Sequence, residues 1–423
     1  MTSPPPVVRS PGAMPPLVSR RRADLALAAL AAGAFCFVTT ETLPSGMLTL
    51  IAEGLGESVS TTGQLVTAYA VVVVVFSLPL TRLTMRTPRR GLLTATLAVF
   101  SAATLLAAFA PTFEVLVAAR VLSGLTHALF WSVAAAAATG LFPPEIRGRM
   151  VARLSIGSSL GPVLGVPLGT WIGQHADWRV AFAVLGGLSI AVAVTVFALL
   201  PSHAPEDGGA ARGTAPSLPR FVFLLATTCA AVAGGMAVLT YIAPYVLDHA
   251  RMSESSLGLV LAVSGAAGVV GTWVVGTFLD SRSRQCLTLA LVGLGLAQVG
   301  LWALGGSAVL VVASIALTGG CFGALNATLV HGGLQVAPGN TDLAMAGISM
   351  AFNVGIAVGA FSGGRVIDGW SVQSVPLLGA AFTVVALALV LFEPRPALRR
   401  RGTTAAADAV RATGGGHRAP IDS

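Results

Sequence analysis

Three ionisable side chains lie deep inside long apolar stretches of the sequence, namely Glu41, Arg120 and His127. Inserting such a group into a membrane span costs roughly 2.5–3.5 kcal/mol, so ionisable residues in spans usually serve a function. Glu41 is the only deep carboxylate. Because burial disfavours its charged form, Glu41 could gain and lose a proton and so contribute to proton coupling. The alternatives are a structural carboxylate that caps amides beside Pro44, or one near the outer interface.

A second group of chemically capable residues shares one helix face. Arg120, Gly124, His127 and Trp131 are spaced by four, three and four residues, so they fall close to one line on a helix. Arg120 could be a fixed charge that tunes a carboxylate such as Glu41, or a structural tie to helix-end carbonyls. His127 could relay protons or bind substrate, although a satisfied interior histidine is the simpler interpretation. Trp131 is expected to pack against its neighbours or to form part of a cavity wall.

The deep polar groups of the second half of the chain are neutral, with Asn326, His331 and Asn353 as the main examples. Their simplest role is hydrogen bonding between helices. We nevertheless include two of them in the predicted substrate-binding set. That set is Phe37, Glu41, His127, Trp131, Asn326 and Asn353.

The elements that would hold these residues are membrane spans. The 423 residues are 55% hydrophobic and only 10% charged, with a mean hydropathy of +0.83, whereas soluble domains carry about 25% charged residues. Segments of about 20 apolar residues can cross a bilayer. We predict an all-α integral membrane protein with twelve spans, at 25–49, 62–82, 91–110, 113–138, 148–173, 178–200, 220–247, 255–279, 286–305, 308–332, 342–367 and 372–392.

A Pro- and Gly-rich stretch with charges follows the sixth span and is typical of a flexible linker. It divides the chain into two six-helix halves. The expected organisation is a disordered tail at 1–23, a first half at 24–200, a linker at 201–219, a second half at 220–393 and a disordered tail at 394–423.

Glycine recurs at every fourth position of the fifth span, at Gly157, Gly161, Gly165, Gly169 and Gly173. Such a strip of small residues lets two membrane helices approach closely. Pro162 and Pro167 lie in the same segment, which a packed membrane helix can tolerate. The strip recurs 198 residues later at Gly355, Gly359 and Gly363, so the two halves are predicted to be pseudo-symmetric copies.

The arginines indicate the orientation in the membrane. Most of them fall in the tails and in alternate loops, which the positive-inside rule places in the cytoplasm. Only Arg179, Arg251 and Arg365 fall on the opposite side. Both termini are therefore predicted to be cytoplasmic, in a multi-pass protein of the plasma membrane.

Three stretches resemble the major facilitator superfamily, and within it the twelve-span drug:proton antiporters, over nearly the whole chain. The first is TTETLPSGMLTLIAEGL, which is similar to the acidic residue followed by Leu-Pro-x-Gly of that branch. The second is AARVLSGLTHALFW, which resembles the Arg-x-x-x-Gly motif of the family. The third and most specific resembles the glycine–proline antiporter motif through Gly157, Gly161, Pro162, Gly165 and Gly169.

The loop between spans two and three departs from the family pattern. It reads SLPLTRLTMRTPRR, without the usual leading glycine and aspartate. The second half has a more complete version in Gly276, Asp280, Arg282 and Arg284. If this loop latches a conformational change, the resemblance implies that the second copy carries more of that role.

The resemblance implies a secondary active exporter that exchanges protons for a small, largely apolar compound by alternating access, as in multidrug or antibiotic resistance. Export of a sugar, nucleoside or other metabolite is the alternative, and an intramembrane enzyme using Glu41 and His127 is a remote one. We expect a monomer that contacts its substrate, protons and the lipid bilayer. No cofactor, metal site or nucleic-acid partner is predicted, and no motif supports an enzyme.

Overall fold

The computed structural model describes residues 19–84, 87–142, 147–201, 215–338 and 341–393. Most of the two predicted tails and of the predicted linker lies outside these ranges. The described residues form helices joined by short loops, with no strand among them.

The helices of the first half follow the predicted spans closely. They are α1 (Arg20–Gly46), α2 (Leu48–Leu55), α3 (Val59–Thr84), α4 (Arg89–Ala108), α5 (Phe113–Thr139), α6 (Arg147–Leu160), η2 (Gly161–Gly165), α7 (Val166–His175) and α8 (Trp178–Leu199).

The second half repeats this pattern with its own interruptions. Its helices are α9 (Leu218–Thr240), α10 (Ile242–Pro244), η3 (Tyr245–His249), α11 (Glu254–Gly276), α12 (Leu279–Leu304), α13 (Ala308–Val336), α14 (Thr341–Gly369), η4 (Val372–Ser374) and α15 (Val375–Phe392).

Among the described residues, eleven helices are long and apolar enough to cross a membrane. The predicted span 148–173 is the exception, because a π-helical turn, η2, separates α6 from α7. Pro162 lies at the start of that turn and has no N–H to continue the α-helical bonding. The chain widens there, and the N–H of Val166 donates to the carbonyl of Gly161 five residues back. The span is therefore present as three successive helical pieces.

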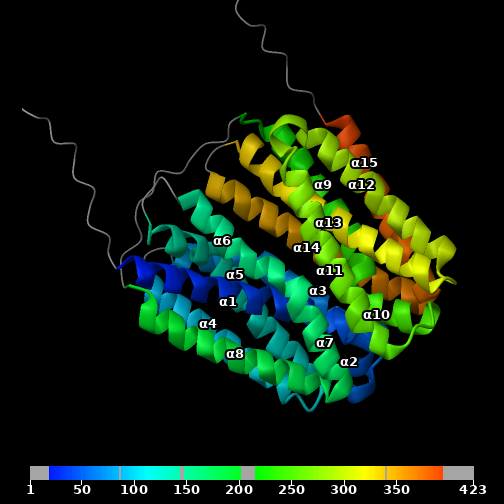
Figure 1. Ribbon diagram of the computed structural model, residues 1–423, viewed down its shortest axis with the longest axis horizontal. Coiled ribbons are helices and arrows are strands. Elements are labelled where there is room, and N and C mark those ends of the chain that lie inside the picture. Colours follow the sequence, from blue (N-terminus) through cyan, green and yellow to red (C-terminus); the bar gives the residue numbers. More distant parts are fainter. Residues whose placement is uncertain (1–18, 85–86, 143–146, 202–214, 339–340, 394–423) are drawn as a thin grey trace, which may run out of the picture.

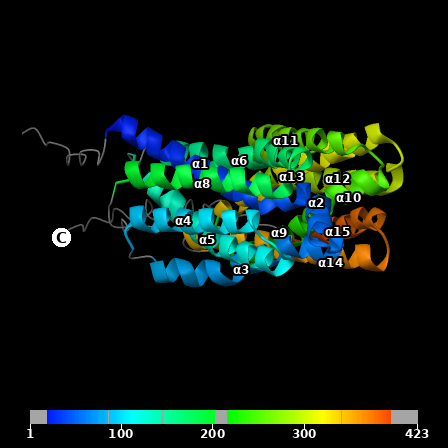
Figure 2. The same ribbon diagram turned by 90° about the horizontal axis from the view of Figure 1, so that it is seen from below.

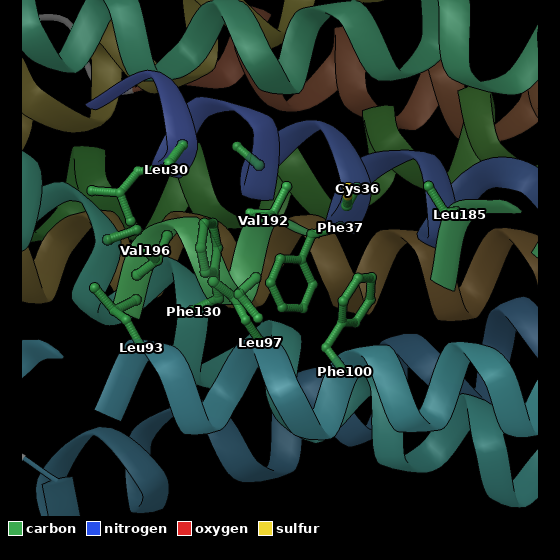
Figure 3. Packing of buried hydrophobic residues seen from close by; sticks show 14 of the residues in the cluster. Leu30, Cys36, Phe37, Leu93, Leu97, Phe100, Phe130, Leu185, Val192 and Val196 are labelled. Carbon is green, nitrogen blue, oxygen red and sulfur yellow. The ribbon is translucent and has the colours of Figure 1, made fainter. Parts of the chain in front are cut away.

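Figures 1 and 2 show α1–α8 grouped in one bundle and α9–α15 in another, with the long helices roughly aligned. The first bundle has a continuous apolar core, drawn in Figure 3. At its centre the Phe37 ring lies 4.0 Å from the Phe100 ring and 4.5 Å from the Phe130 ring, measured between centroids. The boundaries of the two halves as functional units remain a prediction.

The bundles meet where α3 packs on α14 and where η2 and α7 pack on α11. Two polar contacts tie them together. The Ser60 hydroxyl donates to Asp368 Oδ2 at 2.9 Å, and the Gln174 amide donates to the Glu254 carbonyl at 2.7 Å. The first contact joins the start of α3 to the end of α14, and the second joins the end of α7 to the start of α11. Both polar contacts therefore lie at the same end of the molecule.

The glycine strip of the fifth span lies against α1. A Cβ atom at Gly157 would fall 1.8 Å from the carbonyl oxygen of Ala31, and one at Gly161 would fall 2.9 Å from the Val38 side chain. Only glycine permits this approach. The second copy packs on α9 in the same way, with Gly359 against the main chain of Ala233. The repeated strip therefore holds the equivalent pair of helices together in each half.

Candidate functional site

Arg120 on α5 is buried, with 1% of its surface exposed, and it is committed to the main chain of α1. Its guanidinium donates to the Thr40 carbonyl at 2.5 Å and to the Glu41 carbonyl at 3.1 Å. Pro44 explains the first bond, because it lacks the N–H that would otherwise bond to Thr40 four residues earlier. The guanidinium also stacks 4.3 Å from the centre of the Tyr69 ring. Arg120 thus supplies the donor that Pro44 removes.

The Glu41 carboxylate is left without a partner in the part of the chain that the structure describes. No hydrogen bond or ion pair reaches it there, since Arg120 bonds the main-chain oxygen of Glu41 instead. The side chain is half-buried. A carboxylate that is exposed on one side and unpaired can accept either a proton or a hydroxyl group of a ligand.

His127 completes a cluster drawn from three helices. Its Nδ1 atom is hydrogen-bonded to the Tyr69 hydroxyl of α3 at 2.7 Å. The imidazole packs edge-on against Phe37 of α1, with 5.8 Å between ring centroids, and lies 6.1 Å from the Trp131 ring. Phe37, His127 and Trp131 therefore lie together, and Arg120, two turns away on α5, contacts the same tyrosine as His127.

Tyr69 is the member of this cluster that sequence reasoning missed. It is 1% exposed and contacts both Arg120 and His127. A buried tyrosine hydroxyl normally finds a partner, so a tyrosine in the middle of an apolar span was a usable signal. The sequence did not reveal which helix would supply that partner.

Asn353 on α14 carries an unused hydrogen-bond acceptor. Its amide nitrogen donates to the Ser349 carbonyl at 3.0 Å, whereas Oδ1 is buried and has no partner among the described residues. Ala360, two turns further on the same face, packs with Val66 of α3. This places Asn353 on the side of α14 that faces the first bundle.

Asn326 on α13 is exposed rather than buried. It lies one turn after Phe322, which packs against a cluster at the junction of α3, α9 and α14. Residues four apart share a helix face, so Asn326 lies on the same face of α13 as Phe322. His331 instead bonds to Gln335 one turn away on the same helix, at 2.9 Å.

A polar network inside the second bundle was also missed. Gln298 on α12 is fully buried, donates to the Gly234 carbonyl of α9 at 2.8 Å and accepts from the Thr383 hydroxyl of α15 at 2.8 Å. The network therefore joins α9, α12 and α15 through these two hydrogen bonds.

The residues of the proposed conformational loop are only partly connected. Gly276 is the last residue of α11, and Arg282 has the non-helical angles φ −140° and ψ 32° that mark a kink near the start of α12. Arg284 donates to the carbonyls of Val390 and Leu391 at the end of α15. The Asp280 side chain lies outside the described part of the structure. A latch at this loop remains a prediction.

Within the described ranges, no three His, Cys, Asp or Glu side chains lie together in a way that could hold a metal ion, and the four cysteines are unpaired. The candidate site of the first bundle offers one carboxylate, one guanidinium and one imidazole–phenol pair.

Comparison with known proteins supports the same architecture. The family model of the Major Facilitator Superfamily matches residues 30–339. A probable sugar efflux transporter of Pasteurella multocida is 32% identical over 393 residues, which cover 89% of this chain and 94% of the relative. A probable sugar efflux transporter of Helicobacter pylori is 33% identical over 357 residues, covering 84% and 91%.

Solved structures agree with this fold. A bacterial homologue of the human lysosomal transporter Spinster, in an inward-facing and unoccupied conformation, matches with a TM-score of 0.71 at 14% identity, covering 90% of this chain and 100% of that one. A human organic anion transporter matches with a TM-score of 0.64 at 14% identity, covering 88% and 99%. The chain belongs to the major facilitator superfamily and is a multi-pass membrane transporter, not an enzyme.

Proposed function

We propose that this protein exports a small hydroxyl-rich molecule, with sugars as the first class to test, in exchange for protons. The observation that carries the proposal is the unpaired, half-buried carboxylate of Glu41 beside an arginine already bound to main-chain carbonyls. The similarity to probable sugar efflux transporters supports the substrate class.

Exchange follows from competition for that carboxylate. Protonated Glu41 is neutral and accepts weakly, whereas ionised Glu41 accepts hydrogen bonds from hydroxyl groups strongly. A proton and a sugar hydroxyl would therefore displace each other. Across the interface, the free Oδ1 of Asn353 and the exposed amide of Asn326 offer further partners for a polar ligand. His127 and Trp131 would form the wall beside Glu41.

The two halves, 24–200 and 220–393, are proposed to move as units about this site, in a monomer of the plasma membrane. The arginine distribution supports cytoplasmic termini. Single cysteines at positions 202 and 57, in a variant lacking the native cysteines, should react oppositely with an impermeant thiol reagent added from outside. Equal labelling of both positions from outside would refute this orientation.

Export of a largely apolar drug is the second candidate. The half-buried ring of Trp131 beside His127 favours it, because it offers an aromatic surface rather than a hydroxyl partner. This candidate predicts transport of substrates that have no hydroxyl groups.

The deciding experiment measures uptake into inverted membrane vesicles with an imposed pH gradient, using labelled sugars and apolar drugs without hydroxyl groups in parallel. We expect gradient-driven accumulation of a sugar, and its loss in Glu41→Gln. Glu53→Gln is the matched control, because Glu53 is exposed on α2 and undergoes the same chemical change. Accumulation of the drug alone selects the second candidate. Unchanged uphill transport by Glu41→Gln removes Glu41 from proton coupling.

A further inference from the structure

A groove runs between α4 and α8 on the outer face of the first bundle, away from the Glu41 cluster. Its volume is about 390 Å³. Small residues line the α4 side, including Thr94, Ala98 and Ala102, while Ile190 and Phe197 belong to the α8 side. The groove faces outward, since Phe197 is 55% exposed.

One end of this apolar groove is positively charged. Arg90 lies one turn before Thr94 on α4, and its guanidinium stacks 4.4 Å from the centre of the Phe197 ring. Its buried Nε atom has no hydrogen-bond partner, and neither Arg90 nor Arg89 forms an ion pair within the described residues. The guanidinium groups at this end therefore keep N–H donors that are free to bind a ligand.

The surroundings of these arginines favour an anion. They occupy the first turn of α4, where cations are opposed by the helix dipole, and no acidic residue offsets them there. Pro88 precedes the helix and provides no side-chain cap. The free N–H groups of the first turn and two unpaired guanidinium groups would complement a phosphate group.

The length of the groove matches one leaflet of a bilayer. From Thr94 to Leu105 the α4 helix rises about 16 Å, which is close to half of the roughly 30 Å hydrocarbon core. An acyl chain lying along the groove would thus reach from the charged end to the middle of the membrane.

We propose that this groove binds an anionic phospholipid, with an acyl chain along α4 and α8 and its phosphate on Arg89 and Arg90. A free phosphate would leave the apolar part uncovered. A second copy of this chain carries a net charge of +8 and is a poor counterpart for a basic end. An anionic lipid supplies both the apolar chain and the charge.

Native mass spectrometry of the purified full-length protein tests this, with phosphatidylglycerol and phosphatidylcholine of identical chains added in equal amounts. We expect several-fold preferential retention of phosphatidylglycerol. Arg90→Gln should lower that preference about fivefold or more, because it removes charge-assisted hydrogen bonds. Arg82→Gln is the matched control, since Arg82 is exposed near the end of α3, one loop before α4, and does not line the groove.

Ala98→Phe probes the apolar part without changing a charge. Ala98 is exposed, so the added ring fills the groove rather than the core. We expect fewer bound lipids of both kinds in this variant, and an unchanged melting temperature would establish that it is folded.

Three results would overturn the proposal. The first is an equal loss of preference in Arg82→Gln and Arg90→Gln, which would indicate general surface attraction. The second is displacement of phosphatidylglycerol by millimolar inorganic phosphate, which would indicate an anion site without an acyl component. The third is a dimer in place of retained lipid.

Discussion

The two halves of this transporter place opposite chemistry at equivalent positions. In the second half, Gly234, Gln298 and Thr383 are joined by hydrogen bonds. The positions 198 residues earlier hold apolar side chains, and these lie together in the core shown in Figure 3. They are Cys36, Phe100 and Leu185.

The reverse holds for the charged cluster. Arg120 and His127 correspond by the same offset to Thr318 and Leu325, which carry no charge. Each half therefore keeps the shared helix arrangement, including the glycine strip, while the buried arginine and histidine of the described residues both belong to the first half. The comparison teaches that the repeated fold depends on close backbone packing, which leaves the interior chemistry of each half free to diverge.

The largest effect should come from Arg120. Arg120→Leu leaves the carbonyls of Thr40 and Glu41 without this donor, and each buried acceptor left unpaired costs about 1–3 kcal/mol. We expect lost transport and a much lower melting temperature in detergent. Thr318→Val at the equivalent position should change stability far less. Similar melting temperatures for the two variants would contradict the asymmetry between the halves.

The shared glycine strip should be nearly as sensitive in both halves. Gly161→Leu and Gly359→Leu insert side chains where helices touch, and overpacking of this kind costs about 1–3 kcal/mol. Gly187→Leu is the control, because open space surrounds that position. Thermal unfolding and transport would be measured together. If Gly359→Leu left stability and transport unchanged while Gly161→Leu reduced them, the two strips would not be equivalent.

The amide network of the second half should matter less. Gln298→Leu removes two hydrogen bonds and leaves the Thr383 hydroxyl with only its own helix carbonyl, at a cost of about 1–2 kcal/mol. Adding Thr383→Val should recover part of this loss, since replacing both partners by apolar groups is often nearly neutral. Both variants should still transport. Lost transport in a stable double variant would give the network a role beyond packing.

The smallest effect should come from the polar contact between the bundles. Ser60→Ala removes the hydrogen bond to Asp368, which contributes about 0.5–1.5 kcal/mol. We expect a several-fold change in transport rate with little change in melting temperature. Ser77→Ala is the control, because its hydroxyl bonds only to its own helix. Equal rates in both variants would mean that the Ser60 contact does not bias the conformational equilibrium.

Much of the fold could be predicted because each span is a long apolar run, and the glycine period indicated close packing before any neighbour was known. The face shared by Arg120, His127 and Trp131 was likewise readable from spacing alone. Tyr69 and Gln298 were not found, because helical spacing identifies a face but not the helix opposite it. The sequence also did not reveal that the Glu41 carboxylate is unpaired. Pro44 leaves the Thr40 carbonyl without its helical donor, and Arg120 bonds to that carbonyl instead of to the carboxylate.

The division of the fifth span into α6, η2 and α7 has a consequence for biosynthesis. The segment does not qualify as a long apolar helix by itself, and three arginines lie in its first piece. Such a segment enters the bilayer less readily than its neighbours when the translocon presents it alone. Its glycine strip fits against α1, which is synthesised earlier. We therefore expect the fifth span to insert into the membrane by packing on α1. Substitutions in α1 that disturb this contact should leave the fifth span outside the bilayer before the second half is synthesised.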